Sequence, residues 1–370
     1  MNKNIFTTSF ITLALLVATS FAKAQILPCG NNRIDTNALN KARLFRLSQA
    51  KGSLAVNYLV RVFFHIVRND DTTNAPINAA QIKTEFATLL PSYNANNVCF
   101  LNAGFDYVNN TFLNNFFNAD NDPTGFFFNP YQVPGCINVF YMQKIGGNNT
   151  ACNPPCGYGG IALGGIPGTY FLVAKGNIGD GATVSHEMGH SLGLLHSFET
   201  AFGLEKINGS NSSTAGDQIT DTPADPFAYN GDTTCYSISA SGCLYTGTCP
   251  DPDGATNFTP PYTNLMGYWS GTCYPNKFLT NGQFTNVNSI LNTNAAVRNC
   301  LSASTITQDP ITVSSGFYMN SAINTFNTRG DVIFNGSVKA SIGGGTVFLN
   351  PGFHAKPSSG QVKITSKPCN

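Results

Sequence analysis

The alternation of apolar and polar positions predicts a mixed α/β architecture as far as Leu301. Short runs rich in β-branched and aromatic residues are typical of buried strands. Longer segments carry apolar residues at the three- and four-residue spacing of a helix. The expected strands are 58–68, 98–108, 136–143 and 169–175, and the expected helices are 77–94, 278–301 and a segment that begins near 183. This order favours an open α/β sheet with a helix beneath it.

Some positions in this pattern make sharper predictions. Pro91 lies near the end of the expected helix 77–94, where a proline is expected to stop a helix. The strand 169–175 precedes a histidine-rich segment and is expected to form the sheet edge to which an extended peptide adds. The stretch 109–134 predicts no element, whereas 146–168, rich in glycine and proline, is typical of a loop.

The character of the sequence changes twice after the histidine-rich segment. Residues 208–263 are rich in Gly, Ser, Thr, Asp and Cys and show weak periodicity, so we expect disulfides to substitute there for a hydrophobic core. Residues 302–370 contain short β-type runs separated by glycine turns. They predict a small all-β module. Attachment to a surface, export and binding of glycans are all compatible with it.

Charge and the N-terminus indicate the compartment. The formal net charge is +1 and only 11% of the residues are charged, which argues against nucleic acid or an anionic membrane as a partner. Lys3, the apolar run 5–17 and Ala22-Lys23-Ala24 form a signal-peptide pattern with cleavage after Ala24. That run is shorter than the roughly 20 residues that span a bilayer. We therefore expect a secreted, extracellular protein without a membrane span.

The cysteine count supports the same compartment. Eleven cysteines predict a disulfide framework with one cysteine left over. A zinc cluster at Cys152-x-x-x-Cys156 is the less favoured alternative. Between the signal and the first strand, residues 25–52 are interpreted as a propeptide, with a helix over Leu39–Leu47.

The strongest chemical signal is the segment His186–His196, which has the form H-E-x-x-H-x-x-G-x-x-H. Histidines four apart share one helix face, and two imidazoles so placed can bind one zinc ion. A left-handed glycine at 193 would end the helix and return His196 as a third ligand. Three protein ligands leave one position for water, the catalytic pattern, and Glu187 would reach that water. The alternative is a core helix that happens to carry histidines.

This motif and its surroundings resemble the pappalysin family of metzincin zinc endopeptidases. The likeness rests on Gly181–Phe198, on Gly216-Asp217 with Asp221-Thr222-Pro223, on Asn264–Tyr268 and on Phe278–Phe284, and it covers roughly Tyr58–Leu301. It implies a metzincin-type α/β catalytic domain. The chain then divides into a signal peptide (1–24), a propeptide-like segment (25–52), a catalytic domain (53–301) and a β-rich C-terminal module (302–370).

The resemblance also implies roles for single residues. It implies a zinc hydrolase of peptide bonds with one catalytic Zn²⁺ held by His186, His190 and His196, and with Glu187 as general base. Met266 would form the Met-turn beneath the metal, and Tyr268 would help to hold the transition-state oxyanion. Packed core residues are the alternative for both side chains. Cys29 would block the metal in a zymogen, with a plain disulfide as the alternative. Asp217, Asp221 and Thr222 are candidate Ca²⁺ ligands, with a solvated acidic loop as the alternative.

Substrates would be proteins or peptides. Residues 267 and 269–272, which follow the Met-turn, contain no acid, so we expect no strong preference for a basic residue after the cleaved bond. Two rival interpretations stay open at this point. One is a secreted adhesin or carbohydrate-binding protein with a non-catalytic zinc site. The other is a zinc hydrolase that acts on something other than peptides.

Overall fold

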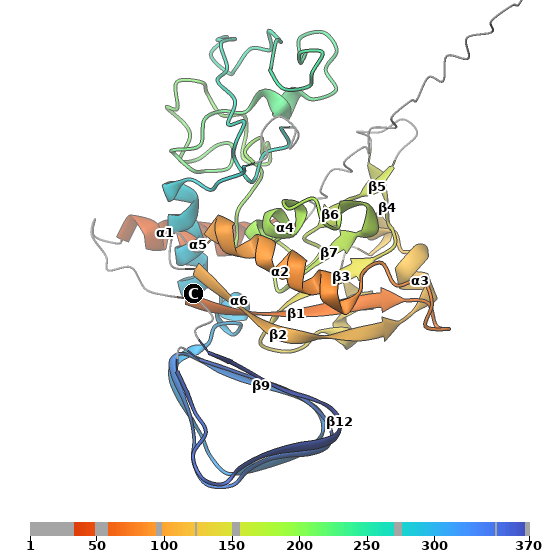
Figure 1. Ribbon diagram of the computed structural model, residues 1–370. Helices are drawn as coiled ribbons and strands as arrows, with labels where there is room; N and C mark the ends of the chain where they lie inside the picture. Colours follow the sequence, from red (N-terminus) through yellow and green to blue (C-terminus); the bar gives the residue numbers. More distant parts are fainter. Residues whose placement is uncertain are drawn as a thin grey trace, which may run out of the picture.

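The computed structural model describes residues 33–48, 58–93, 98–122, 124–149, 156–269, 276–344 and 346–366. The predicted signal peptide, Cys29 and Cys152 lie outside these residues. The chain has a mixed α/β architecture (Figure 1). Among the described residues, no helix is long and apolar enough to cross a membrane.

The central element is a five-stranded sheet in the order β2-β1-β3-β7-β6. Its strands are β1 (Tyr58–Arg68), β2 (Val98–Asn109), β3 (Ile137–Met142), β6 (Gly160–Ile161) and β7 (Tyr170–Ala174). The β1–β2, β1–β3 and β3–β7 pairs are parallel, and β6 pairs antiparallel with β7. Nearly every side chain of β1 is buried, as expected for a strand covered on both faces.

Helices cover one face of this sheet and position the histidine-rich segment. They are α1 (Thr36–Ser48), α2 (Ala79–Tyr93), α4 (Thr183–Ser191), α5 (Asn281–Thr293) and the short α6 (Ala295–Arg298). Side chains from all of them share one hydrophobic core with alternate residues of β1 and β3, or pack against it. A second core lies against the other residues of these strands and includes α3 (Thr111–Asn115) and the 3₁₀ helix Phe126–Tyr131.

The structure confirms several predicted elements and corrects others. The strands 58–68 and 98–108 form as β1 and β2. Pro91 does not stop its helix, because α2 continues through it to Tyr93. The strand 169–175 forms as β7 but is not the edge, since the two-residue β6 lies outside it. The expected loop 146–168 also contains the antiparallel pair β4 (Ile145–Asn149) and β5 (Cys156–Tyr158).

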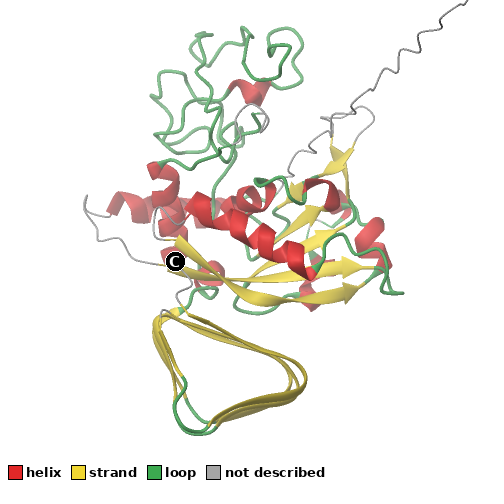
Figure 2. Cartoon of the chain, viewed as in Figure 1, coloured by secondary structure: helices red, strands yellow, loops and turns green. Residues whose placement is uncertain are grey.

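The segment between α4 and α5 is mostly irregular, as Figure 2 shows. A 3₁₀ turn at Pro226–Tyr229 and a disulfide between Cys235 and Cys249 lie within it. Cys99 and Cys243 each take part in a disulfide as well. Cys300 carries a buried thiol, so the odd cysteine of the count need not be Cys29.

The last described residues form a coil of parallel strands, seen as a triangle in Figure 1. The strands are β8 (Ala303–Gln308), β9 (Ile311–Thr328), β10 (Val332–Gly344), β11 (Thr346–Phe348) and β12 (Phe353–Ser366). Ile311, Val332 and Phe353 occupy equivalent positions on successive turns. Phe334, Val338 and Ile342 fill the interior of the coil.

Candidate metal centre

Helix α4 has a defined start and a sharp end. At its start, the Asp180 carboxylate accepts hydrogen bonds from the backbone N–H groups of Ala182 and Thr183, each at 2.9 Å. An acceptor at this place satisfies donors that the helix leaves unpaired. At its end, Gly193 has a φ of +84°, and the Leu194 N–H donates to Gly189 O at 2.9 Å. This left-handed turn reverses the chain and returns His196 toward the helix.

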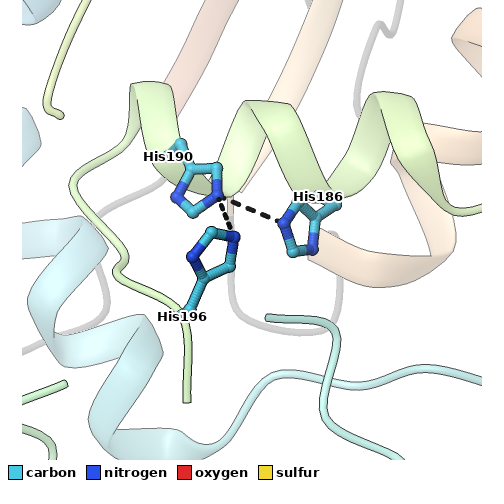
Figure 3. Close-up of side chains that lie close together, drawn as sticks. All are labelled: His186, His190 and His196. Atoms are coloured by element: carbon cyan, nitrogen blue, oxygen red, sulfur yellow. Dashed lines mark hydrogen bonds between the residues drawn. The ribbon is translucent and has the colours of Figure 1, made fainter. Parts of the chain in front are cut away.

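The three imidazoles converge. The Nε2 atom of His190 lies 3.1 Å from Nε2 of His186 and 3.1 Å from Nε2 of His196 (Figure 3). Nδ1 of His186 lies 2.7 Å from Leu265 O, and Nδ1 of His190 lies 2.7 Å from Leu194 O. A carbonyl can only accept, so both rings carry their proton on Nδ1 and direct the Nε2 lone pair toward the common centre.

These side chains fit a metal ion. All three are buried, with exposed fractions of 7% or less. Burial lowers the pKa of each imidazole, and that of His186 falls to about 4. Neutral imidazoles are the form that ligates metals. Nitrogen atoms 3.1 Å apart can share an ion at the roughly 2.0–2.1 Å of a zinc–nitrogen bond. In the described part of the chain, these residues form a group that could hold a metal ion.

Glu187 lies beside the first histidine and is fully buried. The edge strand β6 passes directly over its carboxylate. A side-chain carbon added at Gly160 would lie 2.4 Å from Oε1 of Glu187, so a larger residue there would require the carboxylate to move. The edge strand and the buried acid therefore border the same site.

Residues Asn264–Tyr268 lie beneath the histidines. A side-chain carbon added at Gly189 of α4 would lie 2.5 Å from Sδ of Met266, so the thioether contacts the helix backbone between the two histidines. The Ser197 N–H donates to Met266 O at 3.1 Å. The ring of Tyr268 lies 4.8 Å from the His196 ring and 5.8 Å from the His186 ring, measured between centroids. The structure thus brings both residues to the histidine group.

Asp225 joins this group although its sequence context did not single it out. Its buried carboxylate accepts from the Ser197 hydroxyl at 2.6 Å, from Trp269 Nε1–H at 3.2 and 3.3 Å, and from the Phe227 N–H at 3.0 Å. Ser197 follows His196, and Trp269 follows Tyr268. One carboxylate therefore ties together the chain segments that carry these two rings. Burial raises the pKa of Asp225 to about 6.

The candidate calcium residues lie within reach of one another, since the Thr222 side chain and the Asp221 charge both act on the pKa of Asp217. Asp217 and Thr222 are buried, but Asp221 accepts from Thr280 Oγ1 and from the Gly282 N–H at the start of α5. Glu205 also lies near Asp217. Burial, and then the mutual repulsion of these acids, raises the pKa of Asp217 well above its usual range. Oε2 of Glu205 and Oδ2 of Asp217 make no hydrogen bond to a described residue. Arg46 interacts electrostatically with Asp217.

Similarity to known proteins agrees with a metalloprotease. No family model matches the chain. An extracellular metalloprotease of Podospora anserina is 27% identical over 244 residues, which are 62% of this chain and 72% of the relative. One of Neurospora crassa is 27% identical over 251 residues, 63% and 74% of the two chains. One of Colletotrichum graminicola is 25% identical over 295 residues, 75% and 95% of the two chains. The chain is thus a distant relative of fungal extracellular metalloproteases.

Proposed function

We propose that this protein is a secreted zinc metalloendopeptidase of the pappalysin type. The observation that carries the proposal is the group of buried imidazoles in which Nε2 of His190 lies 3.1 Å from Nε2 of each of the other two, with Glu187 next to the first of them. Protein ligands of this number and type leave an open position on zinc, which is the catalytic arrangement. The distant relationship to extracellular metalloproteases supports both the reaction and the compartment.

The roles of the residues follow from their places. Bound zinc would act as a Lewis acid on the scissile carbonyl and would acidify water. Glu187, as general base, accepts the proton of the attacking water and delivers it to the leaving amine. Tyr268, beside the His196 ring, donates a hydrogen bond to the developing oxyanion. Met266, against Gly189, holds the helix that carries the first two histidines.

The remaining features of the resemblance are part of the same proposal. Residues 53–301 are the catalytic domain, 25–52 the propeptide and 302–370 the C-terminal module, which serves attachment to a surface or to glycans. Cys29 blocks the metal in the zymogen, so Cys29→Ala is expected to give premature activity. If the variant is as inactive before activation as wild type, the proposed switch is wrong.

A calcium site is proposed at Glu205, Asp217 and Thr222, without Asp221. Buried carboxylate oxygens that lack a hydrogen-bond partner among the described residues suit a hard cation that takes oxygen ligands. The experiment that separates this site from the sequence-based assignment is given among the predictions below.

The proposed substrate preference follows from the hydrogen bonds that the acid near the histidines already makes. Asp225 is an acid near the histidines, but its oxygens already accept from Ser197, Trp269 and Phe227. It is therefore not available to a substrate guanidinium, and no strong basic preference is proposed. A peptide-library profile dominated by Arg or Lys after the cleaved bond would contradict this.

The decisive experiment is cleavage of casein by the activated full chain, with metal analysis. Wild type is expected to hold one zinc per chain, to cleave casein and to lose activity when a chelator strips the metal. Glu187→Gln is expected to keep stoichiometric zinc and to lose about 10²–10⁴-fold in kcat, which is the contribution that general-base catalysis typically makes. Zinc binding without cleavage in the wild type would favour the adhesin. Cleavage of esters but not of peptides would favour the non-peptide hydrolase.

A further inference from the structure

A groove of about 580 Å³ lies between the central sheet and the parallel coil. One wall is the face of α2 that carries Ile82, Lys83 and Phe86, and the floor is residues 100–105 of the edge strand β2. The other wall belongs to the coil, which lies beside the β2 edge in Figure 1. At one end the coil contacts β2, since a carbon added at Gly343 would lie 3.0 Å from Leu101. We call this the α2–coil groove. Its volume falls in the range of about 300–1,000 Å³ that ligand sites occupy.

The coil contributes a polar group that lacks a partner. Ser341 of β10 and Lys363 of β12 are register neighbours, and both line the groove. Ala340 and Ile342, the residues on either side of Ser341, belong to the core of the coil, so Ser341 points away from that core. Ser341 is 2% exposed, and its hydroxyl makes no hydrogen bond to any described residue. A buried hydroxyl without a partner is destabilising by about 1–3 kcal/mol, which is relieved when a ligand accepts from it.

The charges that line the groove are of one sign. Lys83 on α2 and Lys363 on β12 face it from opposite walls. The pKa of Lys363 is lowered by burial and by the positive charge of Lys83. No acidic residue lines the groove among the described residues. An anion between these ammonium groups would remove their repulsion.

We propose that the α2–coil groove binds a long-chain carboxylate, that is, a fatty acid. Its carboxylate lies between Lys83 and Lys363 and accepts from the Ser341 hydroxyl. Its hydrocarbon chain lies along Phe86 and Phe105 and the other apolar residues of α2 and β2. A sugar would leave this apolar surface unmatched, and a polyanion would need more than two cations. The proposal does not depend on the proposed peptidase activity.

The test is calorimetric titration of the full chain with saturated fatty acids of increasing length, below their micelle concentrations. Each added methylene is worth about 0.8 kcal/mol when buried, so affinity is expected to rise about fourfold per carbon until the groove is full. The matching methyl esters, which carry no charge, are expected to bind at least about tenfold more weakly.

Variants separate the groove from nonspecific binding. The double variant Lys83→Gln/Lys363→Gln is expected to weaken fatty-acid binding about tenfold, because two partly exposed ion pairs are lost. The control Lys41→Gln/Lys356→Gln, which changes exposed lysines elsewhere, is expected to bind as wild type does. Ser341→Val is expected to raise Tm without ligand and to weaken binding.

Several outcomes would overturn the proposal. They are no binding at any chain length, equal binding of acid and ester, and equal weakening by both lysine pairs. Binding of a short peptide of alternating valine and glutamate, without binding of fatty acids, would assign the groove to an extended peptide that pairs with β2 and would also overturn it.

Discussion

Asp225 offers the sharpest test of how the proposed metal centre is held. In Asp225→Asn the side chain keeps its size but gains an amide NH₂ where an oxygen accepted from Ser197 or Trp269. A donor then faces a donor at one of these places. The Ser197 hydroxyl can rotate to accept, whereas the Trp269 N–H can only donate. We expect the turn after His196 to loosen while the fold persists.

The expected changes in the free energy of unfolding and in the rate of zinc release differ in size for this variant. The pKa of Asp225 rises from 3.8 to about 6, chiefly through burial, so keeping the carboxylate charged at pH 8 is unfavourable by about 3 kcal/mol. The neutral amide removes this term and loses one or two hydrogen bonds worth about 1–3 kcal/mol each. The free energy of unfolding at pH 8 is therefore expected to change by less than about 2 kcal/mol. Groups that support metal ligands typically change metal affinity 10–100-fold, so zinc release is expected to be about tenfold faster.

The assay is release of zinc to a chromogenic chelator, followed by stopped flow, with urea unfolding on the same samples. Ser197→Ala is expected to speed zinc release, because Ser197 follows His196. Trp269→Phe is expected to lower kcat with zinc release unchanged, because Trp269 follows Tyr268. The control Asp232→Asn alters an exposed acid whose partner is Thr234 and should change neither quantity. Unchanged zinc release in Asp225→Asn, at any stability, would refute the reasoning.

Three further predictions follow from single contacts. Gly193→Ala is expected to destabilise the protein by about 2–4 kcal/mol in urea unfolding, since residue 193 has a φ of +84° and the new carbon would lie 2.5 Å from Ile290. The control Gly176→Ala, where nothing lies within 4 Å of the new carbon, should leave the stability unchanged. Equal losses of stability in the two variants would contradict this prediction. Burial raises the pKa of Glu85 from 4.5 to about 7, so its contribution to stability is fully present below pH 4.5 and is lost as the pH rises to about 7. Glu85→Gln should reduce this fall in the free energy of unfolding by roughly 1–2 kcal/mol after allowance for solvent screening. If the variant shows the same dependence of stability on pH as wild type, Glu85 is not the cause. Millimolar Ca²⁺ is expected to raise Tm by several degrees. This increase should be absent in Glu205→Gln and present in Asp221→Asn. If it is absent only in Asp221→Asn, the ligand set expected from the sequence is the correct one.

Features that depend on local spacing were predictable from the sequence. The strand 58–68 is β1 to the residue, because a run buried on both faces is apolar almost throughout. The convergence of His186, His190 and His196 also depends on local geometry, namely one helix face and one left-handed glycine.

Features that depend on distant partners were not predictable. The strand β6 has two residues, one of them glycine, and only its pairing with β7 makes it a strand. Asp225 and Glu205 lie in the irregular segment, where no periodicity indicates which side chains turn inward. The hydrogen-bond partners of Asp221 were not predictable either. The resemblance made it a candidate calcium ligand with Asp217 and Thr222, but nothing local in the sequence indicated its hydrogen bonds to Thr280 and Gly282, at the start of a helix far along the chain.

The glycines around α4 explain why these distant segments can meet at the histidines. At Gly189 the backbone of α4 contacts the Met266 thioether, and at Gly193, in the turn that follows α4, the backbone contacts Ile290 of α5. At Gly160 the edge strand contacts Glu187. A side chain at any of these positions would require α4 or the contacting side chain to shift, and the histidine nitrogens, with 3.1 Å between those of His190 and His186, leave little room for a shift of the helix. The arrangement of the three histidines therefore depends on these close glycine contacts as well as on the histidines themselves, and substitutions at Gly160 and Gly189 should loosen the proposed metal site without changing a proposed ligand.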